Sequence, residues 1–85
     1  MEIFYTSRFK REAKKLPRRF RPMVEERIVW FQQDPVDPRL HTHKLSGALR
    51  GFLAFSINAK VRVIFEFDGK QKAVFHSIGD HSIYD

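Results

Sequence analysis

The stretch VRVIFEFDGKQKAVFHSI, residues 61–78, decides the fold because two strand patterns flank a strong turn signal. In its first half, large apolar side chains recur at every second position, a spacing that is typical of a β-strand with one buried face. Asp68-Gly69 then favours a type I′ turn, since glycine adopts positive φ at little cost. Residues 72–78 predict the returning strand, so we expect an antiparallel β-hairpin.

A further strand is predicted just upstream, over residues 51–57. Leu53, Phe55 and Ile57 alternate along it and share one face. Residues 58–60 are a short hairpin loop that leads into the next strand. We expect the Phe-rich face of this sheet to meet helices and the other face to stay open.

Two apolar stripes with helical spacing lie before the sheet region. Phe9, Ala13 and Leu16 form the first stripe, after a possible cap at Thr6 or Ser7. The second stripe predicts a helix of about four turns and comprises Phe20, Met23, Val24, Ile28 and Phe31. A β-prone piece at residues 3–5 precedes both stripes. The predicted order is therefore β-α-α-loop-β-β-β.

This order predicts an α+β domain in which two N-terminal helices pack on one face of a small, mainly antiparallel sheet. Eighty-five residues leave room for one hydrophobic core, so we expect a single domain over residues 1–85. The sequence has no cysteine, which excludes disulfides and thiolate chemistry. Its longest apolar run, residues 28–31, is far short of the ~20 residues that a membrane span needs. The start lacks a signal-peptide core, and we expect a cytoplasmic protein with no membrane partner.

The positive charge is concentrated near the N-terminus. Residues 1–21 carry eight basic and two acidic side chains, a net charge of +6, whereas residues 22–85 carry eight of each. Such a segment favours binding to phosphate or to an acidic partner, although a merely solvated helix face would show the same pattern. We interpret it as an RNA-binding surface. The candidate RNA-binding residues are Arg8, Lys10, Arg11, Lys14, Lys15, Arg18, Arg19 and Arg50.

Residues 34–50 show no clear period and form a long connection for a domain of this size. Long connections are usually functional or disordered, and we interpret this one as functional because it holds His41, His43 and Lys44. The sequence contains no phosphate-binding glycine loop, no nucleophile elbow and no zinc-protease motif. What remains is phosphate chemistry by histidine, lysine, arginine and tyrosine side chains.

Arg62 is the odd residue in an otherwise apolar strand, on the face opposite Val63 and Phe65. This places Arg62 on the open side of the sheet, where the last strand can bring His81 and Tyr84. RNA cleavage without a metal needs a general base that deprotonates the 2′-OH and cations that stabilise the charge of the phosphorane. It also needs an acid that protonates the leaving 5′-oxygen and a ring that helps hold the nucleobase in place. The chain supplies these residue types. Because its histidines lack a carboxylate at metal-binding spacing, no metal or other cofactor is expected.

Taken in order, four segments resemble the RelE/ParE superfamily of type II toxin–antitoxin toxins. They are TSRFKREAKKLP at residues 6–17, HKLSGALRGFLAFSI at 43–57, VRVIFEF at 61–67 and IGDHSIYD at 78–85. The likeness covers nearly the whole chain, and its strength lies in the order and spacing of the segments. The resemblance also implies the β-α-α-β-β-β fold of that superfamily.

The resemblance implies specific catalytic residues. Similarity to the YafQ branch points to His81, in a Gly-x-His-Ser setting, and to His43, just before a Leu-x-Gly step. Similarity to the RelE and YoeB branches points to Arg62 in the central strand and to Tyr84 at the C-terminus. Lys44 is the nearest candidate for a loop lysine of RelE. The general base stays open between His43 and Lys44.

The sequence departs from each branch, having Ser56 and Lys60 where the YafQ branch has a further His and Asp, and no loop Glu like that of YoeB. The resemblance implies a ribosome-dependent mRNA endonuclease that cleaves codons in the A site without a metal and leaves a cyclic phosphate. Its partners would be the ribosome, mRNA and a cognate antitoxin, with which it would form a hetero-oligomer. Two alternatives are a ParE-like, non-enzymatic inhibitor of DNA gyrase and a catalytically degenerate homologue.

Overall fold

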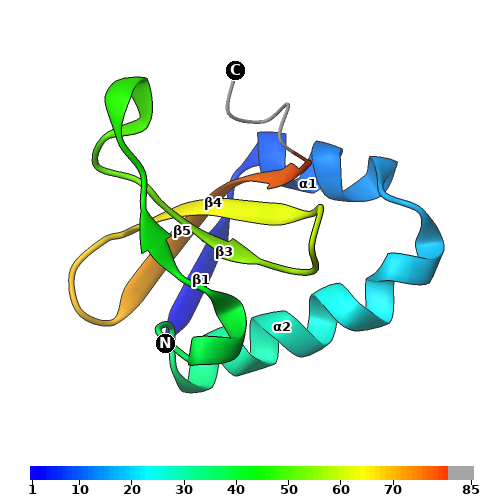
Figure 1. Ribbon diagram of the computed structural model, residues 1–85, viewed down its shortest axis with the longest axis horizontal. Coiled ribbons are helices and arrows are strands. Elements are labelled where there is room, and N and C mark those ends of the chain that lie inside the picture. The colour runs from blue at the N-terminus through cyan, green and yellow to red at the C-terminus, as the bar shows by residue number, and fades with distance from the viewer. Residues whose placement is uncertain (81–85) are drawn as a thin grey trace.

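The structure, a computed structural model, describes residues 1–80 of the chain. Within this range two α-helices pack against a five-stranded sheet (Figure 1). The helices are α1 (Ser7–Lys15) and α2 (Arg21–Gln33), and the strands are β1 (Glu2–Tyr5), β2 (His43–Lys44), β3 (Leu53–Ser56), β4 (Arg62–Phe67) and β5 (Lys72–Gly79). The 3₁₀ turns are η1 (Arg18–Phe20), η2 (Pro38–Leu40) and η3 (Gly47–Leu49). None of the described helices is long and apolar enough to cross a membrane.

The strand order of the sheet is β1-β5-β4-β3-β2. β1 runs parallel to β5, and all the other neighbouring strands are antiparallel. The predicted α+β class and the mainly antiparallel sheet are therefore confirmed. One strand was not expected: β2 pairs with β3 at the edge of the sheet, inside the segment that showed no period.

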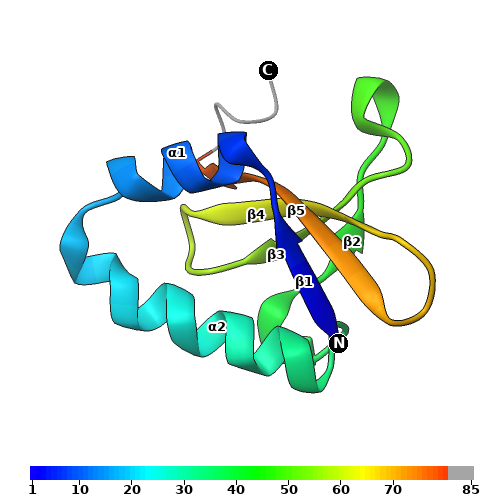
Figure 2. The same cartoon turned by 180° about the vertical axis from the view of Figure 1, so that it is seen from behind.

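Local signals set the start of each helix. The Thr6 hydroxyl oxygen accepts the backbone N–H of Phe9 at 3.1 Å, and the same hydroxyl donates to the carbonyl of His76 at 3.1 Å. The second bond ties the start of α1 to β5, and Figure 2 shows α1 lying alongside the end of that strand. α2 carries Pro22 in its first turn, where a helix has no partner for the N–H that proline lacks.

Packed phenylalanine rings form the centre of the core. Phe31 of α2 is fully buried, and its ring centroid lies 5.1, 4.9 and 5.0 Å from those of Phe55, Phe65 and Phe75 on three strands. Phe9 of α1 packs on the same Phe75 ring at 5.6 Å. Both helices therefore cover one face of the sheet, as the sequence predicts. Aromatic pairs at such separations add about 0.5–1.5 kcal/mol each beyond the burial of area.

The opposite face of the sheet is covered in its middle, whereas the sequence-based expectation was an open face. Ala54 and Ile64 project from it, and their exposed fractions are only 0% and 4%. The chain after η3 folds across this face, where the Phe52 ring meets the His76 ring edge-on at 5.2 Å and Leu49 lines the same hollow. The cover was not predicted, because Leu49 lies outside every periodic element and Phe52 was assigned only to the strand over residues 51–57.

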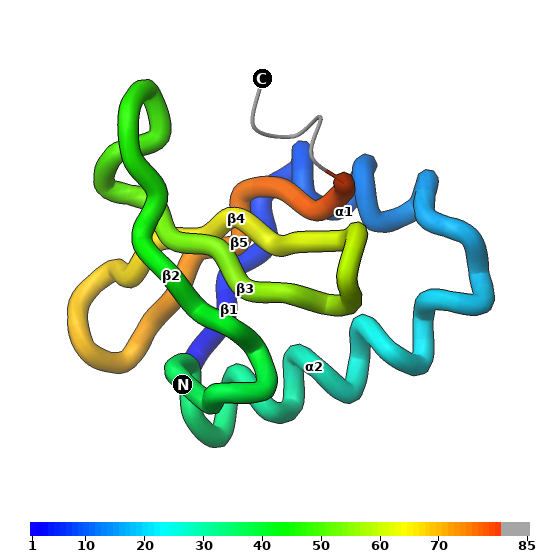
Figure 3. The backbone as a smooth tube through the Cα atoms, in the orientation of Figure 1, coloured from blue at the N-terminus to red at the C-terminus, as the bar shows by residue number. Residues whose placement is uncertain are grey.

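The segment between α2 and β3 is shaped by local turns and by one buried anchor. Figure 3 shows it following the edge of the sheet, starting from the C-terminal end of α2. Leu40, at the end of η2, is fully buried in the core. Thr42 then donates its hydroxyl to the carbonyl of Pro35 at 2.6 Å. These contacts lead the chain directly into β2.

Candidate active site

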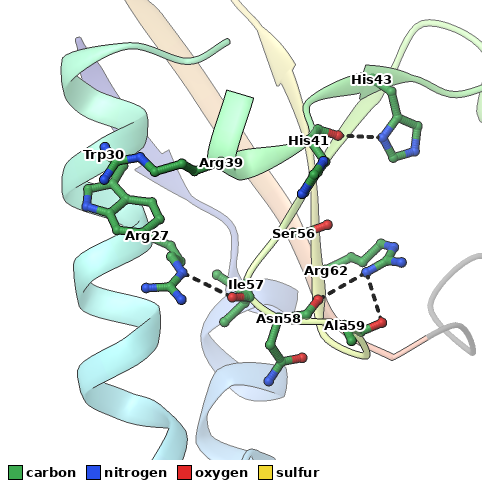
Figure 4. Close-up of a pocket in the computed structure, with 10 residues that line it drawn as sticks. All are labelled: Arg27, Trp30, Arg39, His41, His43, Ser56, Ile57, Asn58, Ala59 and Arg62. Atoms are coloured by element: carbon green, nitrogen blue, oxygen red, sulfur yellow. Dashed lines mark hydrogen bonds between the residues drawn. The ribbon is translucent and has the colours of Figure 1, made fainter. Parts of the chain in front are cut away.

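A pocket opens between α2, η2 and the β3–β4 hairpin (Figure 4). Its volume is about 770 Å³, which is a size typical of small-ligand sites. The residues that line it are Arg27, Trp30, Arg39, His41, His43, Ser56, Ile57, Asn58, Ala59 and Arg62. These described lining residues include three arginines and two histidines and no carboxylate. The composition of the walls therefore favours an anionic ligand.

The strand register places His43 and Arg62 on one face of the sheet. Directly paired residues of antiparallel strands project to the same side, and His43 pairs with Ala54, which pairs in turn with Ile64. Arg62 lies two residues before Ile64 on β4 and shares its side, as does its own partner Ser56. In Figure 4, His43 and Arg62 stand on the sheet side of the pocket.

Lys44 lies on the other face of β2. It pairs with Leu53, whose side chain packs against the core, and successive strand residues alternate between faces. Lys44 is exposed and is not among the residues that line the pocket. The register thus separates the two candidate bases and favours His43, while the role of each stays a prediction.

His43 is held through one ring nitrogen. Its Nδ1 atom lies 2.9 Å from the backbone carbonyl oxygen of His41. Because a carbonyl oxygen can only accept, Nδ1 carries the hydrogen in the neutral ring, which leaves the lone pair on Nε2. His41 itself adopts a left-handed backbone with φ of 52°, and this turn directs the chain from η2 into β2. The tautomer of His43 is the one that a general base needs.

Arg62 is half-buried and anchored by the β3–β4 turn. Its Nη1 donates to the carbonyl oxygens of Asn58 and Ala59 at 3.3 and 3.5 Å. The Asn58 side chain shapes this turn by accepting the backbone N–H groups of Lys60 and Val61, each at 2.8 Å. Within residues 1–80, no side chain or carbonyl accepts from Nε or Nη2 of Arg62. That edge of the guanidinium can grip a phosphate through two parallel bonds.

The opposite wall of the pocket is built on α2. Arg27 donates from Nε to the carbonyl of Ile57 at 3.1 Å, and its guanidinium lies 4.3 Å from the Trp30 ring centroid. Arg39 stacks on the same ring at 3.8 Å and forms an ion pair with Asp37, with 2.8 Å between Nη2 and Oδ2. Hydrogen bonds from Arg39 hold the pKa of Asp37 below its usual range.

Of the predicted catalytic residues, the structure brings Arg62 and His43 together. His81 and Tyr84 lie outside the described residues. β5, the strand that leads towards them, ends at Gly79, which is the cross-strand partner of Arg62. Across residues 1–80, no three His, Asp or Glu side chains gather to hold a metal ion.

The predicted RNA-binding side chains are all exposed: Arg8, Lys10, Arg11, Lys14, Lys15, Arg18, Arg19 and Arg50. The acidic residue of α1, Glu12, turns its carboxylate towards β5 and accepts the Ser77 hydroxyl at 2.6 Å. Arg8 also pairs with this carboxylate at 3.5 Å. The solvent side of α1 is therefore strongly basic.

Three residues of the wall formed by α2 and η2 were not predicted from sequence, namely Arg27, Trp30 and Arg39. The first two stand one helical turn apart, so their contact could have been expected from the i, i+3 spacing. Nothing in the sequence signalled that Arg39 would fold back onto the same ring. Its approach depends on the conformation of η2, which follows no periodic pattern.

No family model and no curated protein matches this chain. Among solved structures, YafQ from E. coli strain BL21(DE3) superposes with a TM-score of 0.81 at 15% identity, covering 98% of this chain and 96% of the other. A YoeB/ParE toxin from Agrobacterium tumefaciens gives 0.79 at 16% identity, with 95% and 99% covered. A chain of the RelB–RelE antitoxin–toxin complex from Methanococcus jannaschii gives 0.75 at 19% identity, with 96% and 95% covered. This chain therefore has the fold shared by YafQ, RelE and YoeB/ParE toxins.

Proposed function

We propose that this chain is the toxin of a type II toxin–antitoxin system and acts as an endoribonuclease on ribosome-bound mRNA. The observation that carries the proposal is the common face of His43 and Arg62 in a basic pocket. One side chain presents an imidazole lone pair and the other presents two guanidinium donors. These are the groups that cleavage through the ribose 2′-OH requires.

In the proposed reaction, Arg62 holds the scissile phosphate and His43 takes the proton of the 2′-OH through Nε2. The 2′-oxygen attacks phosphorus, the bond between phosphorus and the 5′-oxygen breaks, and a 2′,3′-cyclic phosphate results. Charge that builds on the phosphorane oxygens is stabilised by Arg62 and by the other cations of the pocket. The steps balance without a metal ion.

The acid that protonates the leaving 5′-oxygen is assigned to His81, and the ring that stacks beside the reacting nucleotide is assigned to Tyr84. Both assignments rest on the family resemblance of the tail. Gly79, the last residue of β5, pairs with Arg62 of β4, so β5 ends beside a residue that lines the pocket. Each well-positioned acid or base typically contributes about 10²- to 10⁴-fold in rate.

The proposed partners are an antitoxin and the ribosome. RelE-type toxins are known in complex with antitoxins, as in the RelB–RelE complex from Methanococcus jannaschii. An acidic antitoxin would complement the exposed basic side chains of α1 and η1. Ribosomal RNA would use the same charges when the antitoxin is absent, since phosphate contacts dominate such binding.

Induction of the wild type and of Arg62→Ala in cells tests the proposal, with growth and the 5′ ends of mRNA as the two readouts. We expect the wild type to stop growth and to cut mRNA in phase with codons, and Arg62→Ala to lose both effects. Lys70→Ala, in the exposed β4–β5 turn, is the matched control for removing one charge. Circular dichroism checks that the variants are folded.

Undiminished toxicity and cutting by a folded Arg62→Ala protein would reject the endonuclease. Inhibition of gyrase supercoiling with intact mRNA would instead favour a ParE-like activity. Unaffected growth at high levels of the wild type would indicate a degenerate homologue.

A further inference from the structure

Arg39 is held on the rim of the pocket by a carboxylate and by an aromatic ring. Its Nε lies 3.1 Å from Oδ1 of Asp37, its Nη2 lies 2.8 Å from Oδ2, and its backbone N–H donates to Oδ1 at 2.9 Å. Its guanidinium also stacks on Trp30, with 3.8 Å between Cζ and the ring centroid. The Asp37 carboxylate binds one edge of the guanidinium and the Trp30 ring packs on one of its faces. The Arg39 side chain therefore has little conformational freedom.

The position of Arg39 calls for a reason beyond stability. Its side chain keeps 56% of its surface exposed, and an exposed ion pair contributes only about 0–1 kcal/mol. Among the described contacts nothing accepts from Nη1, although Nη1 carries two hydrogens. Arg39 therefore keeps an unused pair of donors at the wall of a pocket that contains Arg62 on its other side.

We propose that Arg39, clamped by Asp37 and Trp30, is a second phosphate subsite that binds the RNA phosphate next to the scissile one. This inference rests on the proposed endonuclease and adds a requirement to it: the substrate must carry a phosphate beyond the bond that is cut. Two guanidinium groups on opposite walls of one pocket hold the strand at two points, which fixes the direction from which its 2′-OH approaches His43, a residue that lines the same pocket. Arg39 is thus a substrate-positioning residue.

The test measures binding of a short, fully 2′-O-methylated single-stranded RNA, which cannot be cleaved, over a series of salt concentrations. For single strands the slope of log K against log[salt] is about −0.7 per phosphate contact. We expect Arg39→Gln to lower the magnitude of the slope by about 0.7 relative to wild type. Lys70→Gln, an equal loss of charge outside the pocket, should leave the slope unchanged.

Asp37→Asn separates an oriented subsite from general attraction between charges. The asparagine oxygen can still cap η2, but the bidentate clamp on Arg39 is lost. General attraction predicts tighter RNA binding, because one negative charge is removed. An oriented subsite predicts binding that is weaker by about two- to tenfold, the cost of ordering a free arginine on each encounter.

Trp30 is the single tryptophan of the chain and gives the location of the bound RNA. We expect the fluorescence emission of Trp30 to change on saturation with the methylated RNA, because the RNA would contact the indole ring or the arginine that stacks on it. An unchanged emission would place the RNA elsewhere and overturn the proposal, as would a slope for Arg39→Gln equal to that of Lys70→Gln. Tighter binding by Asp37→Asn would overturn it as well.

The subsite and the endonuclease fail in different ways. If wild type cuts mRNA in cells while Arg39→Gln binds RNA with the wild-type slope, the subsite is refuted and the nuclease stands. If wild type cuts nothing while binding still depends on Arg39, the nuclease is refuted and an anion subsite remains. These two results come from separate measurements on the same folded proteins.

Discussion

Replacing His43 by alanine should disable the proposed reaction, whereas replacing its neighbour Lys44 should not. The two residues are adjacent on β2, yet His43 pairs with Ala54 and Lys44 pairs with Leu53, so their side chains project to opposite faces. The face of His43 is the face of Arg62. A substitution at either position changes the same short strand, which makes each variant a close control for the other.

The expected difference in cleavage rate between the two variants follows from the role proposed for each residue. Loss of a positioned general base costs about 10²- to 10⁴-fold in rate, or roughly 3–5 kcal/mol of activation free energy. Loss of an exposed lysine off the pocket is a surface change, usually within about 0.5 kcal/mol, which corresponds to about twofold. At least a fiftyfold gap, roughly, should therefore separate His43→Ala from Lys44→Ala.

The assay is single-turnover cleavage of mRNA on programmed ribosomes, followed by the rate of appearance of the cyclic-phosphate product. A double variant sharpens it: Lys44→His in the His43→Ala background restores an imidazole on the wrong face and should recover no activity. If Lys44→Ala loses as much activity as His43→Ala, the lysine is the base and the face argument fails. Recovery in the double variant would refute it equally.

Two further predictions concern stability. Phe31→Ala should lower the free energy of unfolding by about 3–5 kcal/mol and the melting temperature by at least about 12 °C, because it removes the ring at the centre of the aromatic core. Val29→Ala, at a position 48% exposed on the same helix, is the control and should change the melting temperature little in the same thermal scans. Hydrogen bonds from Arg39 lower the pKa of Asp37 in the folded protein, so its stabilising contribution is complete above the unfolded pKa and is lost as pH falls through the lower folded value. The difference in melting temperature between wild type and Asp37→Asn should therefore begin to shrink near about pH 4 and vanish only below the folded pKa.

Elements with repeated patterns were predictable from sequence. The alternation around Val63 and Phe65 located β4, and the helical stripe that ends at Phe31 located α2, because each pattern repeats several times and so excludes other periods. The face of Arg62 followed from the same alternation. Pairing between distant strands was less accessible, since neither the parallel contact of β1 with β5 nor the existence of β2 leaves a local signature.

The candidate site was predictable only in part, for a related reason. Arg62 and His43 could be nominated by residue type and position, but the choice between His43 and Lys44 depends on strand register. Register in this region comes from a pairing of two residues, which is too short to show a period. The contact of Arg39 with Trp30 was missed because it depends on the conformation of the 3₁₀ turn η2.

The segment between α2 and β3 joins the stability of the fold to the geometry of the pocket. One side chain in it, Leu40, is completely buried, and burial of a leucine is worth about 1.5–3 kcal/mol. The residues on either side of this anchor are the polar ones of the site, with Arg39 before it and His41 and His43 after it. The fixed position of Leu40 therefore constrains both the proposed phosphate subsite at Arg39 and the proposed base His43.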